Sequence, residues 1–329
     1  MTAAFDVTGI GNAIVDVIAH ADDAFLAANG IEKGAMTLID TDRAEALYGL
    51  MGPGVESSGG SAGNTMAGFA LLGGRGAYVG KVADDLLGKV FAHDIRASGV
   101  HFATAPLAGG APTARCLIMV TPDAQRSMNT YLGACVELGP NDVDEGLIRD
   151  SQVVYLEGYL FDPPAAKEAF RKAAAVAHAA GRQVSLSLSD SFCVGRHHAE
   201  FRDLVENHVD LLFANEHEIC ALYETQDFDQ ALAAVKGLGK AAALTRSEKG
   251  AVIVVNGETV AVPAEPGVKV VDTTGAGDLY AAGFLYGWTR GAAPALCGKL
   301  GAIAAGEIIA HVGARPEADL KALIKGVLD

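Results

Sequence analysis

The chain has 329 residues, and its 40 acidic residues against 25 basic ones give a formal net charge of −15. This length is enough for one large α/β domain or two smaller ones, with ample core in either case. So acidic a chain lacks the basic stripe that nucleic-acid surfaces carry, which argues against a nucleic-acid partner. The five cysteines include no Cys-x-x-Cys pair, so we expect free thiols in a reducing cytoplasm.

No segment reads as a membrane span or a secretory signal. The longest uncharged stretches, 57–74 and 97–114, are interrupted by Gly, Pro, Asn or His. Residues 1–30 contain no Lys or Arg, and Asp6 and Asp16 interrupt their apolar run. We therefore expect a cytoplasmic protein without a membrane partner.

The N-terminal region predicts a strand over 5–10 and an alternating strand over 14–18. The glycines that follow the first strand do not form a dinucleotide-binding loop, because Ile14 stands where the third glycine is required. Asp16 lies on the second strand, where its carboxylate can accept hydrogen bonds from two hydroxyl groups at once. A solvent-facing strand residue is the alternative interpretation.

A loop of small residues is predicted over 59–64, continued by a helix over 65–72. Gly60 lets the backbone approach a ligand closely, and the Asn64 side chain offers both a donor and an acceptor. An ordinary flexible loop is the alternative for this stretch.

From residue 153 onward, short apolar runs alternate with helical segments, which is typical of a mostly parallel sheet covered on both faces. Pro163-Pro164 opens and Gly181 closes the first helix of this region. A type I′ hairpin turn is predicted at Asn256-Gly257. After residue 72, strands are predicted over 77–82, 115–120, 126–131 (after a turn at 121–125), 153–156, 184–188, 209–214, 241–245, 251–255 and 258–262.

The sequence Asp272-Thr273-Thr274-Gly275-Ala276-Gly277-Asp278 provides the most specific chemical signal. A β-rich run over 268–271 precedes it and an apolar helix over 279–288 follows it. The N–H groups of Gly275, Ala276 and Gly277 would then be unpaired at a helix N-terminus, which is a ready site for an anion. Asp278 stands beside this anion hole, and the pairing predicts phosphoryl transfer with Asp278 as the base.

Two considerations qualify the role of Asp278. A general base works best with a pKa near the operating pH, whereas a helix N-terminus is expected to lower the pKa of a carboxyl group. A loose transition state eases this conflict, because the hydroxyl proton can leave late. The alternative is a Gly-rich turn whose Asp is only a first-turn helix residue.

Asn215 and Glu218 are three residues apart at the start of a predicted helix, so their side chains can face the same way. Mg²⁺ keeps several of its waters, and a single Glu acting through water is adequate for it. An N-cap Asn followed by first-turn acids explains the same residues without a metal.

Four stretches resemble three signatures of the PfkB, or ribokinase-like, carbohydrate kinase family. The motif at 272–278 resembles the C-terminal signature, the stretches 59–64 and 80–88 resemble the N-terminal one, and 215–218 resembles the Asn-x-x-Glu motif. They occur in the family's order and span nearly the whole chain. The resemblance implies one domain over 1–329, a three-layer α/β sandwich with a mostly parallel central sheet and a small β lid formed by roughly 12–40 and 100–132.

The resemblance also implies roles for individual residues. Arg126 would reach the transferring phosphate when the lid closes, although an exposed hairpin arginine is the alternative. Ser247 replaces the first glycine of the family's Thr-x-Gly-x-x-Gly, which puts close backbone approach there in doubt. A late helix over 302–311 would pack on the anion loop, and 313–316 would edge the adenine site. The residues implied to bind the substrate are Asn12, Asp16, Gly60, Asn64, Tyr159 and Arg126, and those implied in catalysis are Gly275, Ala276, Gly277 and Asp278. The residues implied to bind the nucleotide are Asn215, Thr245, Gly250, Gly275 and Gly277. Mg²⁺ would be held by Glu218 through a water, and Asp272 would be a ligand of the K⁺ ion that many relatives bind near the anion loop.

The substrate is indicated by stretches that resemble adenosine kinases: Gly59-Gly60-Ser61, where ribokinases carry Lys, and the segments 155–160 and 187–192. We therefore expect transfer of a phosphoryl group from ATP to adenosine, giving AMP, with Mg²⁺ as cofactor. The alternatives are a ribokinase-like sugar kinase, a kinase of another purine nucleoside, and a catalytically inactive nucleoside or sugar sensor. Exposed lid strands can pair between subunits or be shielded within one chain, so both a monomer and a homodimer remain open.

Overall fold

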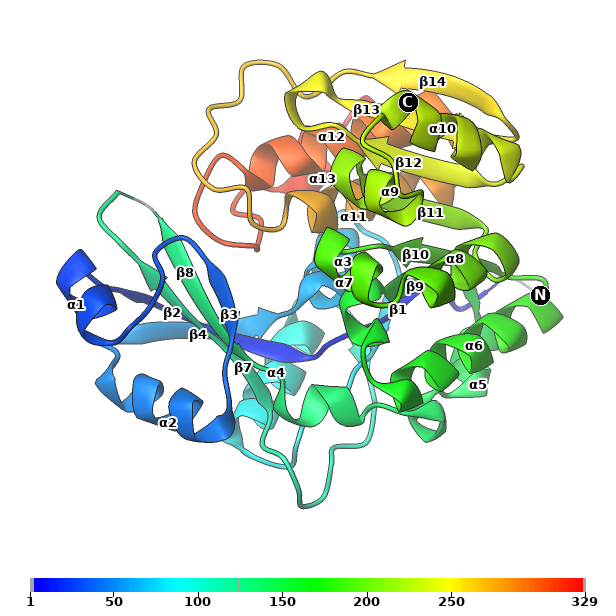
Figure 1. The fold of residues 1–329 in the computed structure, drawn as a ribbon. Coiled ribbons are helices and arrows are strands. Elements are labelled where there is room, and N and C mark those ends of the chain that lie inside the picture. The colour runs from blue at the N-terminus through cyan, green and yellow to red at the C-terminus, as the bar shows by residue number, and fades with distance from the viewer. Residues whose placement is uncertain (1–2, 124, 328–329) are drawn as a thin grey trace.

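A nine-stranded sheet between two layers of helices dominates the computed structural model, which describes residues 3–123 and 125–327 (Figure 1). The strands from the third to the ninth in this sheet run parallel to one another, and the first two form an antiparallel hairpin at one edge, which joins the third strand in antiparallel orientation. Their order is β14 (Glu258–Val262), β13 (Ala251–Val255), β12 (Ala241–Thr245), β11 (Leu211–Asn215), β10 (Gln183–Ser187), β9 (Ser151–Glu157), β1 (Phe5–Ile10), β5 (Gly76–Val79) and β6 (His101–Phe102).

Helices cover both faces of this sheet, so its central strands are apolar on both sides. One face packs on α3 (Ser61–Leu71), α11 (Ala276–Trp288) and α12 (Pro294–Ile308), which share a core with strand residues such as Tyr155 and Phe213. The three-layer α/β sandwich is confirmed. The other face packs on α5 (Glu145–Arg149), α6 (Pro164–Ala179), α7 (Ser191–Arg196), α8 (His198–Asn207), α9 (Glu216–Leu222) and α10 (Phe228–Gly237).

A second, five-stranded sheet forms the lid, which stands to the left of the main body in Figure 1. One of its faces packs on α1 (Asp23–Ala28), α2 (Thr41–Leu50) and α4 (Leu86–Ala97) through Val15, Val17, Leu117 and Met119. Asp16 alternates with these residues and therefore lies on the opposite face. The strand order is β3 (Met36–Leu38), β8 (Arg126–Tyr131), β7 (Ala114–Val120), β2 (Ile14–His20) and β4 (Gly54–Gly59).

The lid differs from the predicted one at two places. β4 was not predicted, because a strand rich in Gly and Ser has no apolar alternation. It forms by antiparallel pairing with β2, in which Gly59 lies opposite Ile14 and Gly54 lies opposite Ala19. β6 pairs with β5 and belongs to the central sheet, so that part of the segment 100–132 lies outside the lid. The hairpin joining β7 to β8 is confirmed, although Ala124 of its turn lies outside the described residues.

Around the anion loop, one predicted strand is absent from the described structure and two predicted helix starts are wrong. Residues 268–271 are not a strand, because the N–H of Val271 donates to the carbonyl oxygen of Ile309 at 2.8 Å instead of meeting a strand edge. α12 begins at Pro294, well before the predicted start at 302, with proline at a first-turn position where its missing N–H costs nothing. α3 begins at Ser61, so most of the loop predicted over 59–64 is a helical turn.

The type I′ hairpin is confirmed by positive φ at both Asn256 (52°) and Gly257 (80°). All five cysteines are free thiols, as expected. None of the helices in the described part of the chain has the length and apolarity needed to cross a membrane. The remaining elements are α13 (Leu320–Leu323) and the 3₁₀ turns η1 (Gly133–Glu137), η2 (Pro140–Asp142), η3 (Gly158–Phe161) and η4 (Ser247–Lys249).

Candidate active site

Asp278 lies in the first turn of α11, where it meets the first turn of α3. Its Oδ1 accepts a hydrogen bond from Ser61 Oγ at 2.6 Å, and its Oδ2 accepts one from Asn64 Nδ2 at 3.1 Å. Burial raises the pKa of Asp278, although the two hydrogen bonds and the charge of Arg315 act in the opposite direction. The expectation of a lowered pKa is therefore wrong, because desolvation outweighs the helix terminus. A raised pKa suits a general base.

The anion loop places two free donors beside this carboxyl group. Gly275 is the N-cap of α11 and has a φ of 77°, which favours glycine. The N–H of Ala276 donates to Thr273 O at 3.2 Å, so this one of the three predicted donors is already paired. The N–H groups of Gly275 and Gly277 meet no protein acceptor among the described residues. A Cβ on Gly277 would meet no atom within 4 Å, so packing does not explain the glycine, whereas a closely approaching ligand does.

Asp16 faces the same site from the lid. A Cβ on Gly59 would lie 2.4 Å from Asp16 Cγ, so the carboxyl group packs directly over this glycine. Burial raises the pKa of Asp16 to about 6, and the charge of Asp278 adds to the rise while Arg315 and Arg126 oppose it. The structure thus brings the predicted base and the predicted hydroxyl-binding carboxylate together.

Glu157, which the sequence analysis did not single out, joins the two segments that are predicted to bind the substrate. This buried carboxylate at the end of β9 accepts hydrogen bonds from Asn12 Nδ2 (2.8 Å), Asn12 N (3.3 Å) and Ala62 N (2.8 Å). Burial raises the pKa of Glu157 to about 7. A carboxylate that ends an apolar, doubly covered strand was the signal that could have revealed it, because such a residue is rarely buried without a partner.

Two amide oxygens in the site lack a donor. Asn12 Oδ1 and Asn64 Oδ1 are buried and accept no hydrogen bond in the described structure. Buried acceptors are normally satisfied, so these two suit ligand hydroxyl groups. Gly60 accepts a hydrogen bond from Asn64 N at 2.8 Å and has a φ of 82°, and a Cβ there would lie 2.2 Å from Asn12 O. A side chain at position 60 would therefore clash with the backbone, which explains why glycine is needed there.

Arg126 and Asp272 form a buried ion pair between the lid and the anion loop. Arg126 Nη1 lies 2.6 Å from Asp272 Oδ2, and the two side chains are 5% and 8% exposed. The alternative of an exposed hairpin arginine is therefore wrong. The Nε and Nη2 groups of Arg126 are buried and have no acceptor in the described structure. Such donors match the oxygens of a phosphate.

The Asp272 carboxylate is fully used within the protein. Besides Arg126, it accepts hydrogen bonds from Thr274 N (2.9 Å), Thr274 Oγ1 (2.7 Å) and Gly313 N (3.1 Å). Burial opposes ionisation, but these hydrogen bonds prevail and lower the pKa of Asp272. All four acceptor positions of the carboxylate are filled.

Asn215 and Glu218 form a capping box at the start of α9. Asn215 Oδ1 accepts from the N–H of Glu218, while Glu218 accepts from Asn215 N at 2.9 Å and Asn215 Nδ2 at 2.6 Å. Burial raises the pKa of Glu218 to about 7. Each carboxylate oxygen keeps one acceptor position, which fits a metal-bound water. In the described ranges, no group of three His, Cys, Asp or Glu side chains is placed to hold a metal directly.

Thr245 and Asn215 are paired across β12 and β11, so both lie at the carboxyl edge of the sheet. Ser247, in the turn after Thr245, has a φ of 51°, so the turn keeps a conformation that glycine adopts easily. Gly250 is explained by packing, since a Cβ there would lie 2.1 Å from Val262 O.

Tyr159 and Arg315 complete the surroundings of the site. Tyr159 lies in η3, directly after β9, and is 41% exposed. Burial and the charges of nearby carboxylates, including Asp278, raise the pKa of its hydroxyl group. Arg315 donates to Ser58 Oγ at 2.6 Å and to Gly63 O at 3.2 Å. Its side chain therefore lies beside the lid and α3, whereas residues 313–316 were expected to edge the adenine site.

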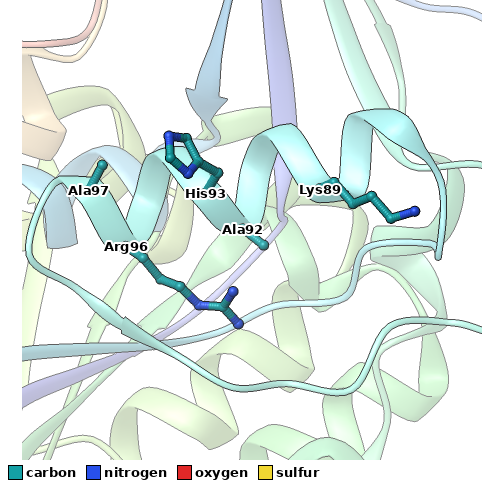
Figure 2. A pocket seen from close by; sticks show the side chains of 5 residues that line it. All are labelled: Lys89, Ala92, His93, Arg96 and Ala97. Carbon is teal, nitrogen blue, oxygen red and sulfur yellow. The ribbon is translucent and has the colours of Figure 1, made fainter.

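A surface cavity of about 440 Å³ lies away from these residues, along α4 (Figure 2). All the side chains that line it belong to this one helix, and none takes part in the contacts around Asp278. The candidate active site is therefore the place where the lid meets α3 and α11, and not this cavity. The cavity is lined by Lys89, Ala92, His93, Arg96 and Ala97.

Several known proteins share the sequence pattern and the fold of this chain. The sequence matches the pfkB family carbohydrate kinases over residues 36–320. The structure of adenosine kinase from Sinorhizobium meliloti is similar with a TM-score of 0.90 and 59% identity, covering 98% of this chain and 99% of that one. That of a probable sugar kinase protein from Rhizobium etli has a TM-score of 0.91 and 55% identity, covering 98% of each chain. The ATP-dependent ribose-1-phosphate kinase of Halopiger xanaduensis is 32% identical over 243 residues, which are 71% of this chain and 74% of that protein. The chain is an ATP-dependent phosphotransferase that belongs to the pfkB family of carbohydrate kinases.

Proposed function

We propose that this kinase transfers the γ-phosphoryl group of ATP to the 5′-hydroxyl of adenosine. The observation that supports this substrate is the apolar face of the lid beside Asp16. Residues directly opposite each other on paired strands point to the same face of a sheet. The registers of β2, β7, β8 and β3 therefore surround Asp16 with the apolar side chains of Ile14, Ile18, Met36, Leu38, Cys116, Ile118, Val120 and Met128.

This face suits a nucleoside better than a free sugar. Met36 and Leu38 at its edge are 53% and 56% exposed, and an exposed apolar patch of this kind marks a binding surface. A purine ring can cover it favourably, whereas ribose alone carries hydroxyl groups on nearly every carbon. Tyr159 presents a partly exposed ring that can stack on the base. The 59% identity to an adenosine kinase supports the same substrate.

The ribose would be held by the polar groups between the lid and α3. Asp16 would accept hydrogen bonds from ribose hydroxyl groups, and the unpaired Oδ1 atoms of Asn12 and Asn64 would accept further ones. This places the 5′-hydroxyl beside Asp278 and in line with the γ-phosphate. Closure of the lid keeps water away from the phosphoryl group.

In the transfer step, Asp278 takes the proton of the 5′-hydroxyl while the oxygen bonds to the γ-phosphorus and the bond to ADP breaks. The free N–H groups of Gly275 and Gly277 hold the charge of the moving phosphoryl group. The two unpaired donors of Arg126 can hold its oxygens from the lid side.

Metal contacts form part of the proposal. Glu218 would hold Mg²⁺ through a water, near the nucleotide-binding residues Asn215, Thr245 and Gly250, and the ion supplies charge neutralisation on ATP. The filled acceptor positions of Asp272 mean that K⁺ could bind its carboxylate only by displacing a donor such as Arg126. We therefore expect turnover that does not require K⁺.

The test is an ADP-release assay with Mg-ATP and a panel of acceptors, run with and without K⁺. The acceptors are adenosine, inosine, guanosine, ribose, ribose 1-phosphate, fructose and 2-keto-3-deoxygluconate. We expect kcat/KM to be highest for adenosine and at least about 100-fold above the values for the free sugars, because the free sugars leave the apolar face of the lid uncovered. Preference for a free sugar or sugar phosphate would contradict the adenosine assignment, and no turnover on any acceptor would favour a non-catalytic sensor.

A further inference from the structure

Arg315 places a positive charge inside the junction of the lid, α3 and the C-terminal loop. Its Nη2 donates to the carbonyl oxygen and the Oγ of Ser58 at 2.5 and 2.6 Å, and its Nη1 donates to Gly63 O at 3.2 Å. Its Nε is buried without an acceptor in the described structure. Neutral oxygens alone do not balance a guanidinium charge that has been removed from water.

The balancing charges are carboxylates that Arg315 does not touch directly. Its contact Ser58 adjoins Gly59, over which the Asp16 carboxyl group packs, and its contact Gly63 adjoins Asn64, which donates to Asp278. Asp94, Asp16 and Asp278 are therefore the acidic groups that face its charge. Asp94 is linked to it through Ser58, whose N–H and Oγ donate to Asp94 Oδ2 at 2.8 and 2.6 Å. The guanidinium therefore lies among one carboxylate behind the lid and two within the active site.

We propose that Arg315 is a positioning residue for phosphoryl transfer: its charge keeps Asp16 and Asp278 ionised together, and its hydrogen bonds fix the Gly59-Gly60 turn. This inference rests on the proposed use of Asp278 as the base. Two carboxylates in one desolvated site disfavour each other's ionisation, so without a nearby cation one of them takes up a proton. A protonated Asp278 cannot accept the proton of the substrate hydroxyl.

The other charged groups near Asp278 make this role specific to Arg315. Asp16 on β2, Glu157 on β9 and Glu218 on α9 all feel the charge of Asp278, and all three are acidic. Arg126 on β8 also acts on Asp16, but its Nη1 is committed to Asp272 at 2.6 Å. Tyr78 on β5 also faces Arg315 and stays neutral, because burial raises the pKa of its hydroxyl group far above its ordinary value.

The test measures kcat/KM against pH from 5 to 9 for the wild type, Arg315→Met, Arg315→Gln and Arg315→Lys. Both neutral variants should move the acidic limb of the profile to higher pH by at least about one unit, as expected for loss of a nearby opposite charge. Arg315→Lys keeps the charge and should leave the limb within about half of that shift. Arg315→Gln also keeps a donor for Ser58. If Arg315→Met does not fold, the pH profiles of Arg315→Gln and Arg315→Lys still separate loss of the charge from loss of the side chain.

Two further variants separate charge from structural support. Ser58→Ala removes hydrogen bonds to Arg315 and Asp94 but no charge, so it should lower Tm without moving the acidic limb. Arg75→Met breaks the pair with buried Asp6 at the other end of β1 and should behave in the same way. An acidic limb that stays at the wild-type position in both neutral Arg315 variants would overturn the inference. The assay uses whichever acceptor shows the highest turnover, so a wrong substrate assignment leaves this test intact.

Discussion

Asp278 is oriented before any substrate binds. Ser61 and Asn64 each donate to one of its carboxylate oxygens, and both donors come from the first turn of α3. A base that is fixed in advance needs little reorganisation during the reaction. Burial raises its pKa toward the working range, while the two donors and Arg315 keep the ionised form accessible. The motif around Asp278 thus works only together with a helix more than two hundred residues away in the sequence.

Gly277 offers a test of the anion hole that leaves the fold intact. A Cβ at this position has open space and alanine favours a helix, so Gly277→Ala should leave Tm unchanged or raise it slightly. The methyl group would occupy the space of the phosphoryl group, so we expect kcat to fall by at least about tenfold; removal of one oxyanion donor typically lowers kcat by about 100- to 1,000-fold. Melting curves and steady-state rates check both parts.

Gly181→Ala is a poor control because its φ is 67°, whereas Gly195→Ala, also in open space within a helix, is suitable. Unchanged kcat in Gly277→Ala would contradict the assigned role of this N–H.

The lid is joined to the catalytic end of the molecule by the Arg126–Asp272 pair. β7 and β8 form an antiparallel hairpin, and Arg126 is the first residue of β8. Because the pair is buried, breaking it leaves an uncompensated charge and releases one anchor of the hairpin.

Arg126→Met should therefore loosen the lid as well as slow the reaction. We expect hydrogen exchange in β7 and β8 to become faster by at least about tenfold, corresponding to about 1.4 kcal/mol of local stability, with little change in β11 or β12. Exchange measured by mass spectrometry on ligand-free protein checks this. Arg115→Met is the matched control, since Arg115 lies on β7 and stacks on Tyr48 without reaching the anion loop. Equal exchange in the two variants would contradict the anchoring role.

Regular elements with strong periodicity were predictable from the sequence. β1, β8, β12, β13 and β14 begin and end at the predicted residues, because turn residues or charged residues flank these short runs. β4 was missed because its Gly-Ser-rich sequence becomes a strand only through pairing with β2. The run over 268–271 has strand-like residues but finds no strand edge to pair with, so tertiary structure overrides its local preference.

At the scale of the whole molecule, buried carboxyl groups make stability depend on pH. Burial raises the pKa of Asp16 to about 6 and those of Glu157 and Glu218 to about 7. A carboxyl group with a raised folded-state pKa contributes stability that is fully present below its unfolded pKa and is lost as pH rises through the folded value. The lowered pKa values of Asp6, Asp85 and Asp272 act only at the acidic end, where stability falls as pH falls.

We therefore expect the Tm of the ligand-free protein to fall by at least about 2 °C between pH 5 and pH 8. The net charge of −15 adds self-repulsion in the same direction. Thermal melts in buffers of matched ionic strength check this, with repeats at high salt to separate the screened contribution of net charge from the buried groups. A Tm that rises steadily over this interval would contradict the assigned burial of the three carboxyl groups.

The motifs predicted most of the residues that meet at the candidate active site, but not the contacts that hold this site together. Asp278, Asp16, Asn64 and the anion loop could be named because short motifs carry them. Glu157 and Arg315 act through partners between 95 and 257 residues away in the sequence, and no local pattern reveals such contacts. The pairing of Ala276 N–H with Thr273 and the burial of Arg126 likewise depend on the folded geometry.

The account depends most directly on Asp278 as the base. The deciding measurement compares Asp278→Asn with the wild type, using kcat from ADP release and adenosine Kd from calorimetry. Asparagine keeps the shape of the side chain but cannot take up the proton, so kcat should fall by about 1,000-fold, within the range known for general bases, while Kd changes by less than about tenfold, or 1.4 kcal/mol. Turnover that stays within tenfold of the wild type would contradict the mechanism.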